Sequence, residues 1–157
     1  MIKFIKFIII FSILSGCGYS PMLAGKDYPF TLNSIKIEGE KKKINSLIQN
    51  NLNNSISKRN QGEKINKIQY DLEIFTNFSK SVLSNDSKGD PTTFEQNIEV
   101  DVIIYKDGEK IKTVTIKKKN SYNNLNDKFE LKKYEDNLIE NLCYNIAVRI
   151  MNILSNV

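Results

Sequence analysis

Residues 68–79 read IQYDLEIFTNFS and residues 94–104 read FEQNIEVDVII. In both segments apolar and polar side chains alternate, and this period of two is typical of a β-strand that buries one face. The positions expected to face inward are Ile68, Tyr70, Leu72, Ile74, Thr76 and Phe78, then Phe94, Ile98, Val100, Val102 and Ile104. The polar residues 84–91 lie between the segments, so we expect two long antiparallel strands.

A third strand is expected over residues 109–122. A two-residue hairpin at Asp107-Gly108 would place Val114 opposite Asp101, which puts an apolar residue on the polar face. A three-residue loop, Lys106-Asp107-Gly108, with the glycine in the left-handed conformation, instead pairs Val100 with Val114. The same register pairs Ile98 with Ile116 and Ile103 with Ile111. We therefore expect the longer loop.

Two helices and a short strand complete the predicted order. Phe30, Leu32, Ile35 and Ile37 indicate a strand that ends at Gly39, with a break in the alternation near Ser34. Apolar residues three or four apart predict an amphipathic helix over 41–59, stopped by Asn60 and Gly62; they are Ile44, Leu47, Ile48, Leu52 and Ile56. Asn126 or Asp127 can cap a final helix of roughly 28 residues, about 42 Å long. Its apolar positions are Leu131, Tyr134, Leu138, Leu142, Ile146, Ile150, and Ile153 or Leu154.

The resulting order β-α-β-β-β-α predicts an α+β fold. A helix between the first two strands implies a parallel crossover, and the later strands form an antiparallel meander. Each helix has one apolar stripe to bury. We expect a two-layer α/β sandwich in which two helices pack on one face of a roughly four-stranded mixed sheet, formed by a single domain over residues 30–157.

The composition argues against an enzyme. The 157 residues include no His, so mechanisms with an imidazole base are excluded and zinc sites lose their commonest ligand. We find no catalytic, cofactor-binding or metal-binding motif. Glu99 and Asp101 share one strand face, which suits a solvated face better than a catalytic dyad. Arginine is scarce and the basic excess is small, so we also expect no nucleic acid partner.

The N-terminus has the features of an export signal. Lys3 and Lys6 precede an apolar run that is shorter than the roughly 20 residues of a membrane-spanning helix. Leu14-Ser15-Gly16-Cys17 is similar to the lipobox of bacterial lipoproteins, which predicts a signal peptide over 1–16, lipidation of Cys17 and a tether over 17–29. The alternative is an ordinary secretory cleavage site beside a chance cysteine. Gly18, in place of Asp, favours a lipid-anchored, periplasm-facing location at the outer membrane.

Processing at this site would change the charge and leave one thiol. The mature chain would have 141 residues, with 21 basic against 18 acidic side chains, so its net charge would be +3. Cys143 would be the only free thiol and could form no intrachain disulfide. It follows Leu142 in the apolar pattern of the last helix. A buried structural thiol is the expected state, and an intermolecular disulfide is the alternative.

The predicted architecture, the sequence CGYSPML at 17–23, Ser121-Tyr122-Asn123 after the last strand and the long final helix together resemble the LPS-assembly lipoprotein family LptE, in its alphaproteobacterial form. Glu135 and Asp136 match the acidic position of the family helix, whereas the alanine-rich positions are retained only at Ala147. The resemblance implies a plug inside the outer-membrane β-barrel LptD, forming a heterodimer that helps to assemble the barrel and deliver lipopolysaccharide. The alternative is a freestanding lipid-binding or transporter-accessory lipoprotein of the envelope.

The resemblance also implies contact with the phosphates of lipopolysaccharide. Candidate contacts are Lys80, Lys88, Lys117, Lys118 and Lys119. The alternative for residues 117–119 is protection of a strand edge against pairing. Residues 41–43, three lysines at the start of a helix, oppose its dipole; they either face an anion or are solvated.

Overall fold

The computed structural model describes residues 28–59 and 67–157. The strands are β1 (Phe30–Gly39), β2 (Ile68–Asn85), β3 (Pro91–Lys106) and β4 (Glu109–Asn123), and the helices are α2 (Lys42–Arg59) and α3 (Lys128–Leu154). The signal peptide, Cys17, the tether up to residue 27 and the helix stop expected at Asn60 and Gly62 lie outside the described residues.

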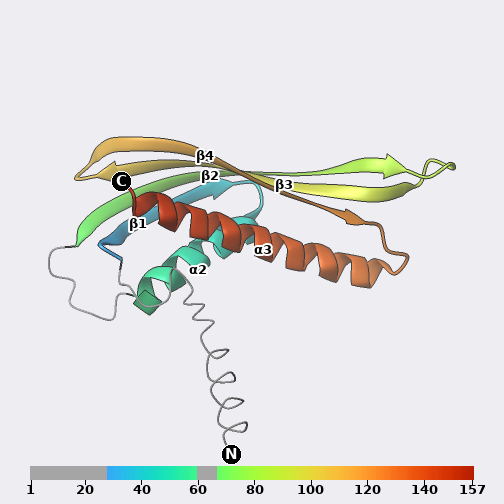
Figure 1. Cartoon of the computed structure of the whole chain (residues 1–157), viewed down its shortest axis with the longest axis horizontal. Coiled ribbons are helices and arrows are strands. Elements are labelled where there is room, and N and C mark those ends of the chain that lie inside the picture. The colour runs from blue at the N-terminus through green and yellow to red at the C-terminus, as the bar shows by residue number, and fades with distance from the viewer. Residues whose placement is uncertain (1–27, 60–66) are drawn as a thin grey trace, which may run out of the picture.

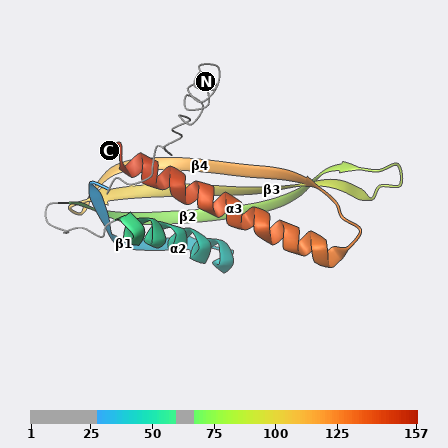
Figure 2. The same ribbon diagram turned by 60° about the horizontal axis from the view of Figure 1, so that its bottom comes forward.

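The expected α+β architecture is confirmed. The strands form one sheet in the order β1-β2-β3-β4, in which β1 runs parallel to β2 and the other neighbours are antiparallel. Both helices cover the same face of the sheet (Figures 1 and 2). The β2–β3 hairpin extends past the other elements at one end (Figure 1). Helix α2 covers only the half of the sheet that contains β1, whereas α3 crosses the sheet diagonally.

The core lies between the sheet and the helices, and it contains the alternating residues of the two long strands. Leu72, Ile74, Ile98, Val100 and Ile104 are at most 1% exposed. Two expected core positions differ: Ile68 is 40% exposed at the start of β2, and Tyr134 is 46% exposed on α3. Tyr28, two residues before the expected start of the domain, is also buried, and its ring centroid lies 5.1 Å from that of Phe30.

The helix α3 begins where the sequence predicted. Asp127 is its N-cap, and the carboxylate accepts hydrogen bonds from the backbone N–H groups of Phe129 and Glu130 at 2.8 and 3.1 Å. These bonds satisfy two of the four amide groups that a helix start leaves without partners. The first turn of α3 is therefore held at a defined place beside the end of β4.

The register of the β3–β4 hairpin differs from the expectation. The turn has two residues, Asp107 and Gly108, both with positive φ, as a type I′ turn requires. A bulge at Ile111 then shifts the pairing by one residue, so Val100 lies opposite Ile116 and Val102 opposite Val114. The expected pairs of Val100 with Val114, Ile98 with Ile116 and Ile103 with Ile111 are wrong. The bulge restores the matching of apolar faces that the short turn alone would lose.

A second bulge confirms the break predicted near Ser34. The pairing of β1 with β2 shifts by one residue between Leu32 and Ser34. The apolar residues before and after the bulge therefore point to the same face of the sheet. Asn33 and Ser34 donate side-chain hydrogen bonds to Asp71 at 2.9 and 2.6 Å. These bonds, that from Ser34 first, lower the pKa of the Asp71 carboxyl. The irregular point of the edge strand is thus tied to its neighbour by side chains.

The strand β1 ends at a close approach to β2. Gly39 pairs with Thr76, and a Cβ at residue 39 would lie 2.1 Å from Thr76 Oγ1 and 2.5 Å from Thr76 O. The Thr76 hydroxyl donates to Asn45 Oδ1 at 2.6 Å, and Asn45 Nδ2 donates to Gly39 O at 3.1 Å. Glycine therefore lets one hydrogen-bonded unit join the end of β1, the first turns of α2 and the middle of β2.

We predict that Gly39→Ala lowers the free energy of unfolding by about 1–3 kcal/mol, because the added methyl group overlaps β2 backbone as well as a side chain. Urea unfolding monitored by circular dichroism measures the change. Ser46→Ala, at an exposed position in the same turn of α2, is the control and should stay within about 0.5 kcal/mol. Equal stability of the two variants would contradict the close approach.

Cys143 is 0% exposed, so the expected buried thiol is confirmed. Burial, followed by the nearby charge of Glu140, raises the pKa of the thiol to about 12. The folded protein therefore holds this thiol in its protonated, unreactive form. The burial leaves no accessible sulfur for an intermolecular disulfide.

We predict that Cys143 resists iodoacetamide at about pH 8.5, where a free thiol is about half ionised. Mass spectrometry of the folded chain and of the chain in denaturant measures the extent of alkylation. Modification should occur only in denaturant, and alkylation at comparable rates in both states would show that the α3 face is wrongly placed.

Candidate functional site

A cavity of about 260 Å³ lies on the helix-covered side of the sheet. It forms because β1 ends opposite Thr76, so α2 begins beside the next residues of β2, Phe78 and Lys80. The other wall is α3. Charged groups dominate the lining, namely Lys41, Lys43, Lys80, Lys132, Glu135 and Asp136. Four ammonium groups against two carboxylates leave a net charge of +2 around the cavity.

Asp136 joins the two helices at one side of the cavity. Its Oδ1 lies 3.0 Å from Lys43 Nζ on α2 and 2.8 Å from Lys132 Nζ one turn earlier on α3. Hydrogen bonds from Lys132 and then from Lys43 lower the pKa of the Asp136 carboxyl. Because this carboxylate is ionised, it holds the amino end of α2 against α3 despite the lysines there.

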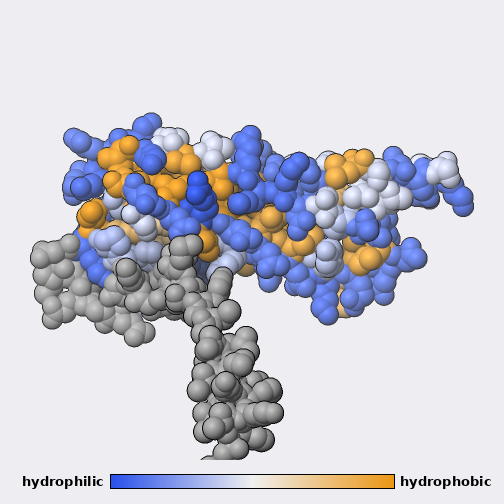
Figure 3. All heavy atoms as spheres, in the orientation of Figure 1, coloured by the Kyte–Doolittle hydropathy of each residue, from blue (hydrophilic) through white to orange (hydrophobic). Residues whose placement is uncertain are grey.

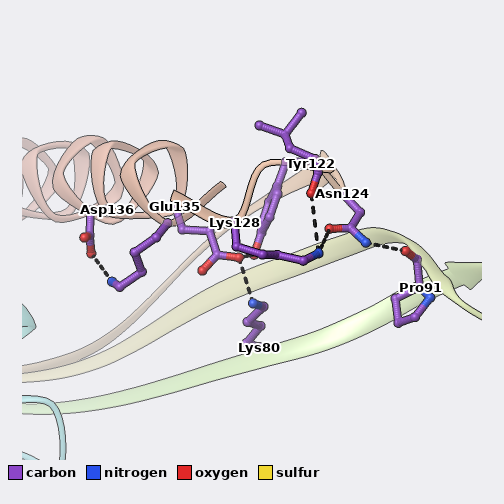
Figure 4. Close-up of polar contacts among 9 residues, drawn as sticks. Lys80, Pro91, Tyr122, Asn124, Lys128, Glu135 and Asp136 are labelled. Atoms are coloured by element: carbon purple, nitrogen blue, oxygen red, sulfur yellow. Dashed lines mark hydrogen bonds and ion pairs between the residues drawn. The ribbon is translucent and has the colours of Figure 1, made fainter. Parts of the chain in front are cut away.

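Glu135 connects α3 with the sheet. Its Oε1 accepts from Lys80 Nζ on β2 and from the Tyr122 hydroxyl on β4, each at 2.7 Å (Figure 4). The Glu135 side chain is only 12% exposed. Lys80 Nζ also lies 4.5 Å from the centroid of the Phe94 ring. Three strands and one helix therefore meet around a single carboxylate.

Tyr122 and Gln96 extend this network into the sheet. Burial and then the hydrogen bond to Glu135 raise the pKa of the Tyr122 hydroxyl, so it stays protonated and donates to Glu135. The Gln96 side chain acts on the pKa of this hydroxyl in the opposite direction and lowers it, as the smallest of the four contributions. Gln96 is 1% exposed, and its Oε1 has no hydrogen-bond partner among the described residues. It is also part of the cavity lining.

The five lysines suggested for lipopolysaccharide contact do not form one cluster. Lys80 lines the cavity, and Lys88 lies in the β2–β3 turn, where its backbone N–H donates to Asp86. Lys117 and Lys119 pair across the strands with Glu99 at 2.9 Å and Glu95 at 3.1 Å on the helix-free face. Lys118 lies opposite the buried Ile98, so it belongs to the helix-covered face of the β4 edge.

The helix-free face carries the carboxylates considered for a dyad. Glu99 is paired with Lys117, and Asp101 accepts from the Thr115 hydroxyl at 2.5 Å. On the same face, Lys36 Nζ lies 3.6 Å from Glu73 Oε1. These pairs make a solvated polar surface. No group of three or more potential metal ligands occurs within residues 28–59 and 67–157.

Sequence reasoning missed Gln96 and did not connect Lys41 and Lys43 with Glu135 and Asp136. Gln96 is the one amide among the inward positions of β3, and this polar interruption of an apolar series was the available signal. Of the two alternatives for the lysines at 41–43, full solvation fails for Lys43, because it faces Asp136. Lys41 Nζ lies 5.8 Å from the centroid of the Phe78 ring.

Apolar residues are also exposed where the hairpin projects. Val82 and Leu83 near the end of β2 are 48% and 52% exposed, and Phe129 at the start of α3 is 75% exposed. Apolar surface is visible on this end of the molecule (Figure 3). Neither α2 nor α3, the helices of the described residues, is long and apolar enough to cross a membrane.

No protein-family profile and no curated protein sequence matches this chain. Solved structures do match its fold. The rare lipoprotein B of Shewanella oneidensis has a TM-score of 0.56 at 15% identity, over 79% of this chain and 95% of that one. This chain has the lipoprotein B fold. Lipoprotein B of Nitrosomonas europaea has a TM-score of 0.60 at 15% identity, over 82% and 86% of the two chains.

A minor lipoprotein of Acinetobacter baumannii has the same fold, with a TM-score of 0.56 at 17% identity over 78% of this chain and 92% of that one. In each of these three structures the shared fold extends over most of both chains. At these identities it establishes the fold, and it assigns no role to an individual side chain.

We predict that Glu135→Gln lowers the free energy of unfolding by about 1–2 kcal/mol, because Lys80 loses its partner in a mostly buried site. Glu99→Gln is the matched control on the helix-free face. Its partner Lys117 is 64% exposed, so this loss should cost less than about 0.5 kcal/mol. Urea unfolding of both variants tests the difference, and equal losses would contradict the role of Glu135.

Proposed function

We propose that this chain is an outer-membrane lipoprotein of the LptE type, which plugs and helps to assemble the LptD β-barrel and so supports lipopolysaccharide transport to the outer leaflet. The observation that carries the proposal is a fold shared with lipoprotein B structures over about four fifths of the chain. The lipobox-like Leu14-Ser15-Gly16-Cys17 supports a lipid anchor, and the proposed role is not enzymatic.

The helix-free face of the sheet supports contact with a barrel lumen. Lys36, Glu73, Glu99 and Lys117 form ion pairs across this face, which is consequently polar without a large charge of either sign. The interior of an outer-membrane barrel is polar, so such a surface can pack there without burying unpaired charges. Lys80 and the lysines of the cavity are the proposed contacts for the phosphates of lipopolysaccharide, with Lys88 and Lys118 beyond the cavity.

The proposed anchor has a direct test. Cys17→Ala removes the only sulfur that the lipobox-like motif offers for acylation, and two or three acyl chains are needed for stable anchoring. We predict that the variant moves from the membrane fraction to the soluble periplasmic fraction when it is expressed without the barrel partner. Cys143→Ala is the control and should remain in the membrane fraction. Retention of Cys17→Ala in the membrane would contradict lipidation at this residue.

The proposed partner is tested by affinity purification of the tagged chain from detergent-solubilised envelopes, followed by mass spectrometry. We predict a large outer-membrane barrel at a ratio of one to one. Recovery of the chain alone, or with subunits of an inner-membrane transporter, would contradict the plug and favour an accessory lipid-binding lipoprotein.

A further inference from the structure

The two edges of the sheet differ in charge. The strand β4 forms one edge, and five of its fifteen residues are lysines, namely Lys110, Lys112, Lys117, Lys118 and Lys119. A series of like charges opposes the addition of a further strand. The strand β1 forms the other edge, and its ten residues include one lysine, Lys36, and one carboxylate, Glu38. Charge therefore protects β4 against strand pairing and leaves β1 open to it.

The strand β1 offers backbone groups and apolar surface to a further strand. An edge strand directs alternate N–H and C=O groups away from its sheet, and among the described residues no strand lies beyond β1. The bulge comes before Ser34, so residues 35–39 pair regularly with β2. Within them, Ile35 and Ile37 pack against the core and remain partly exposed. A strand paired with this segment would cover the exposed remainder of both side chains.

Both charged side chains of residues 35–39 are available to a partner. Lys36 Nζ lies 3.6 Å from Glu73 Oε1, and its side chain is 71% exposed, so the ammonium group can donate to a second carboxylate. Glu38 is exposed and forms no ion pair within the described part of the chain. The pairing of β1 with β2 places both on the helix-free face. The segment thus presents one charge of each sign on one face.

These charges select one register for an antiparallel pair of identical strands. A twofold axis at Lys36 places two ammonium groups opposite each other, and an axis at Glu38 does the same with two carboxylates. An axis between two residues sets an apolar face against a polar one. An axis at Ile37 matches the faces and places Lys36 of each copy opposite Glu38 of the other. Residues 35–39 are therefore self-complementary about Ile37.

We propose that two copies of this chain associate through antiparallel β1 strands, with the twofold axis at Ile37. The two Ile37 side chains meet on the helix-covered face, and Ile35 lies opposite Gly39, which has no side chain to obstruct it. The two four-stranded sheets become one continuous sheet, with α2 and α3 of both copies on the same face. Such an isologous interface closes at a dimer. The inference does not depend on the proposed barrel partner, because the helix-free face stays uncovered.

The test is sedimentation velocity of the mature full chain in a non-ionic detergent whose density matches the buffer, so that the micelle adds nothing to the buoyant mass. We expect a monomer–dimer equilibrium with a Kd of about 1–100 μM, as for a small interface. A chain that remains monomeric throughout this range would overturn the proposal.

Charge reversal locates the interface. Lys36→Glu sets carboxylates opposite each other and Glu38→Lys sets ammonium groups opposite each other, so each should dimerise at least about tenfold more weakly. Lys117→Glu is the matched control, because it also breaks an ion pair on the helix-free face but lies on β4, and its dimerisation should be unchanged. Circular dichroism confirms folding. Wild-type affinity in folded Lys36→Glu would overturn the proposal, as would equal weakening by Lys117→Glu.

A mixture of the two variants tests the charge pairing. Lys36→Glu has carboxylates at both 36 and 38, and Glu38→Lys has ammonium groups at both, so a heterodimer regains two ion pairs. We expect the equimolar mixture to associate within about threefold of the wild-type affinity. A mixture that associates no more tightly than either variant alone would overturn the pairing. Association caused by shared micelles would not respond to charge and would overturn it equally.

A disulfide tests the register. Only the residue on the axis meets its own copy, at a Cα separation of about 4.5–5.5 Å, which a disulfide can span. Ile37→Cys should form a disulfide-linked dimer under mild oxidation. Ile35→Cys is the control, because its two copies lie about 14 Å apart along the strands and should not be linked. Linkage of Ile35→Cys, or none of Ile37→Cys, would overturn the axis at Ile37.

Discussion

The structure depends on one constraint, which is that the apolar faces of four strands must coincide beneath two helices. A shift of one residue between any two strands would turn every core side chain of one strand to solvent. Bulges at Asn33 in β1 and at Ile111 in β4 maintain the match at the two ends of the sheet order. Each inserts one residue where the turn or the neighbouring strand would otherwise invert the pattern. The continuous core from Tyr28 to Leu154 is the result.

The helices do not cover this face evenly. Helix α2 and β1 cover one half of the sheet, where the main core lies, and only the first half of α3 covers the other. There a smaller cluster of Tyr122, Leu131 and Leu138 packs with Phe94. Polar contacts compensate for the thinner packing, since Glu135 binds residues from β2 and β4 at the same place. The cavity lies between these two regions because β1 ends and α2 begins in the middle of the sheet.

This arrangement separates two surfaces with different uses. The helix-free face carries three ion pairs between neighbouring strands, Lys36–Glu73, Lys117–Glu99 and Lys119–Glu95, which suit it to a polar partner. The helix-covered face has the cavity, whose lining concentrates four lysines and two carboxylates.

The sequence alone determined the element order, the α+β class, the break in β1 and a helix cap at Asn126 or Asp127, and it favoured a buried Cys143, because each follows from local periodicity or from the chemistry of one residue. The register predicted for β3 and β4 was wrong. A three-residue loop and a two-residue turn followed by a bulge both align the apolar faces of the two strands, and only the pairing along the whole strands distinguishes them. The cavity also required the tertiary structure. Its residues come from α2, β2, β3 and α3, and no spacing in the sequence records that Lys43 meets Asp136 or that Gln96 faces a cationic wall.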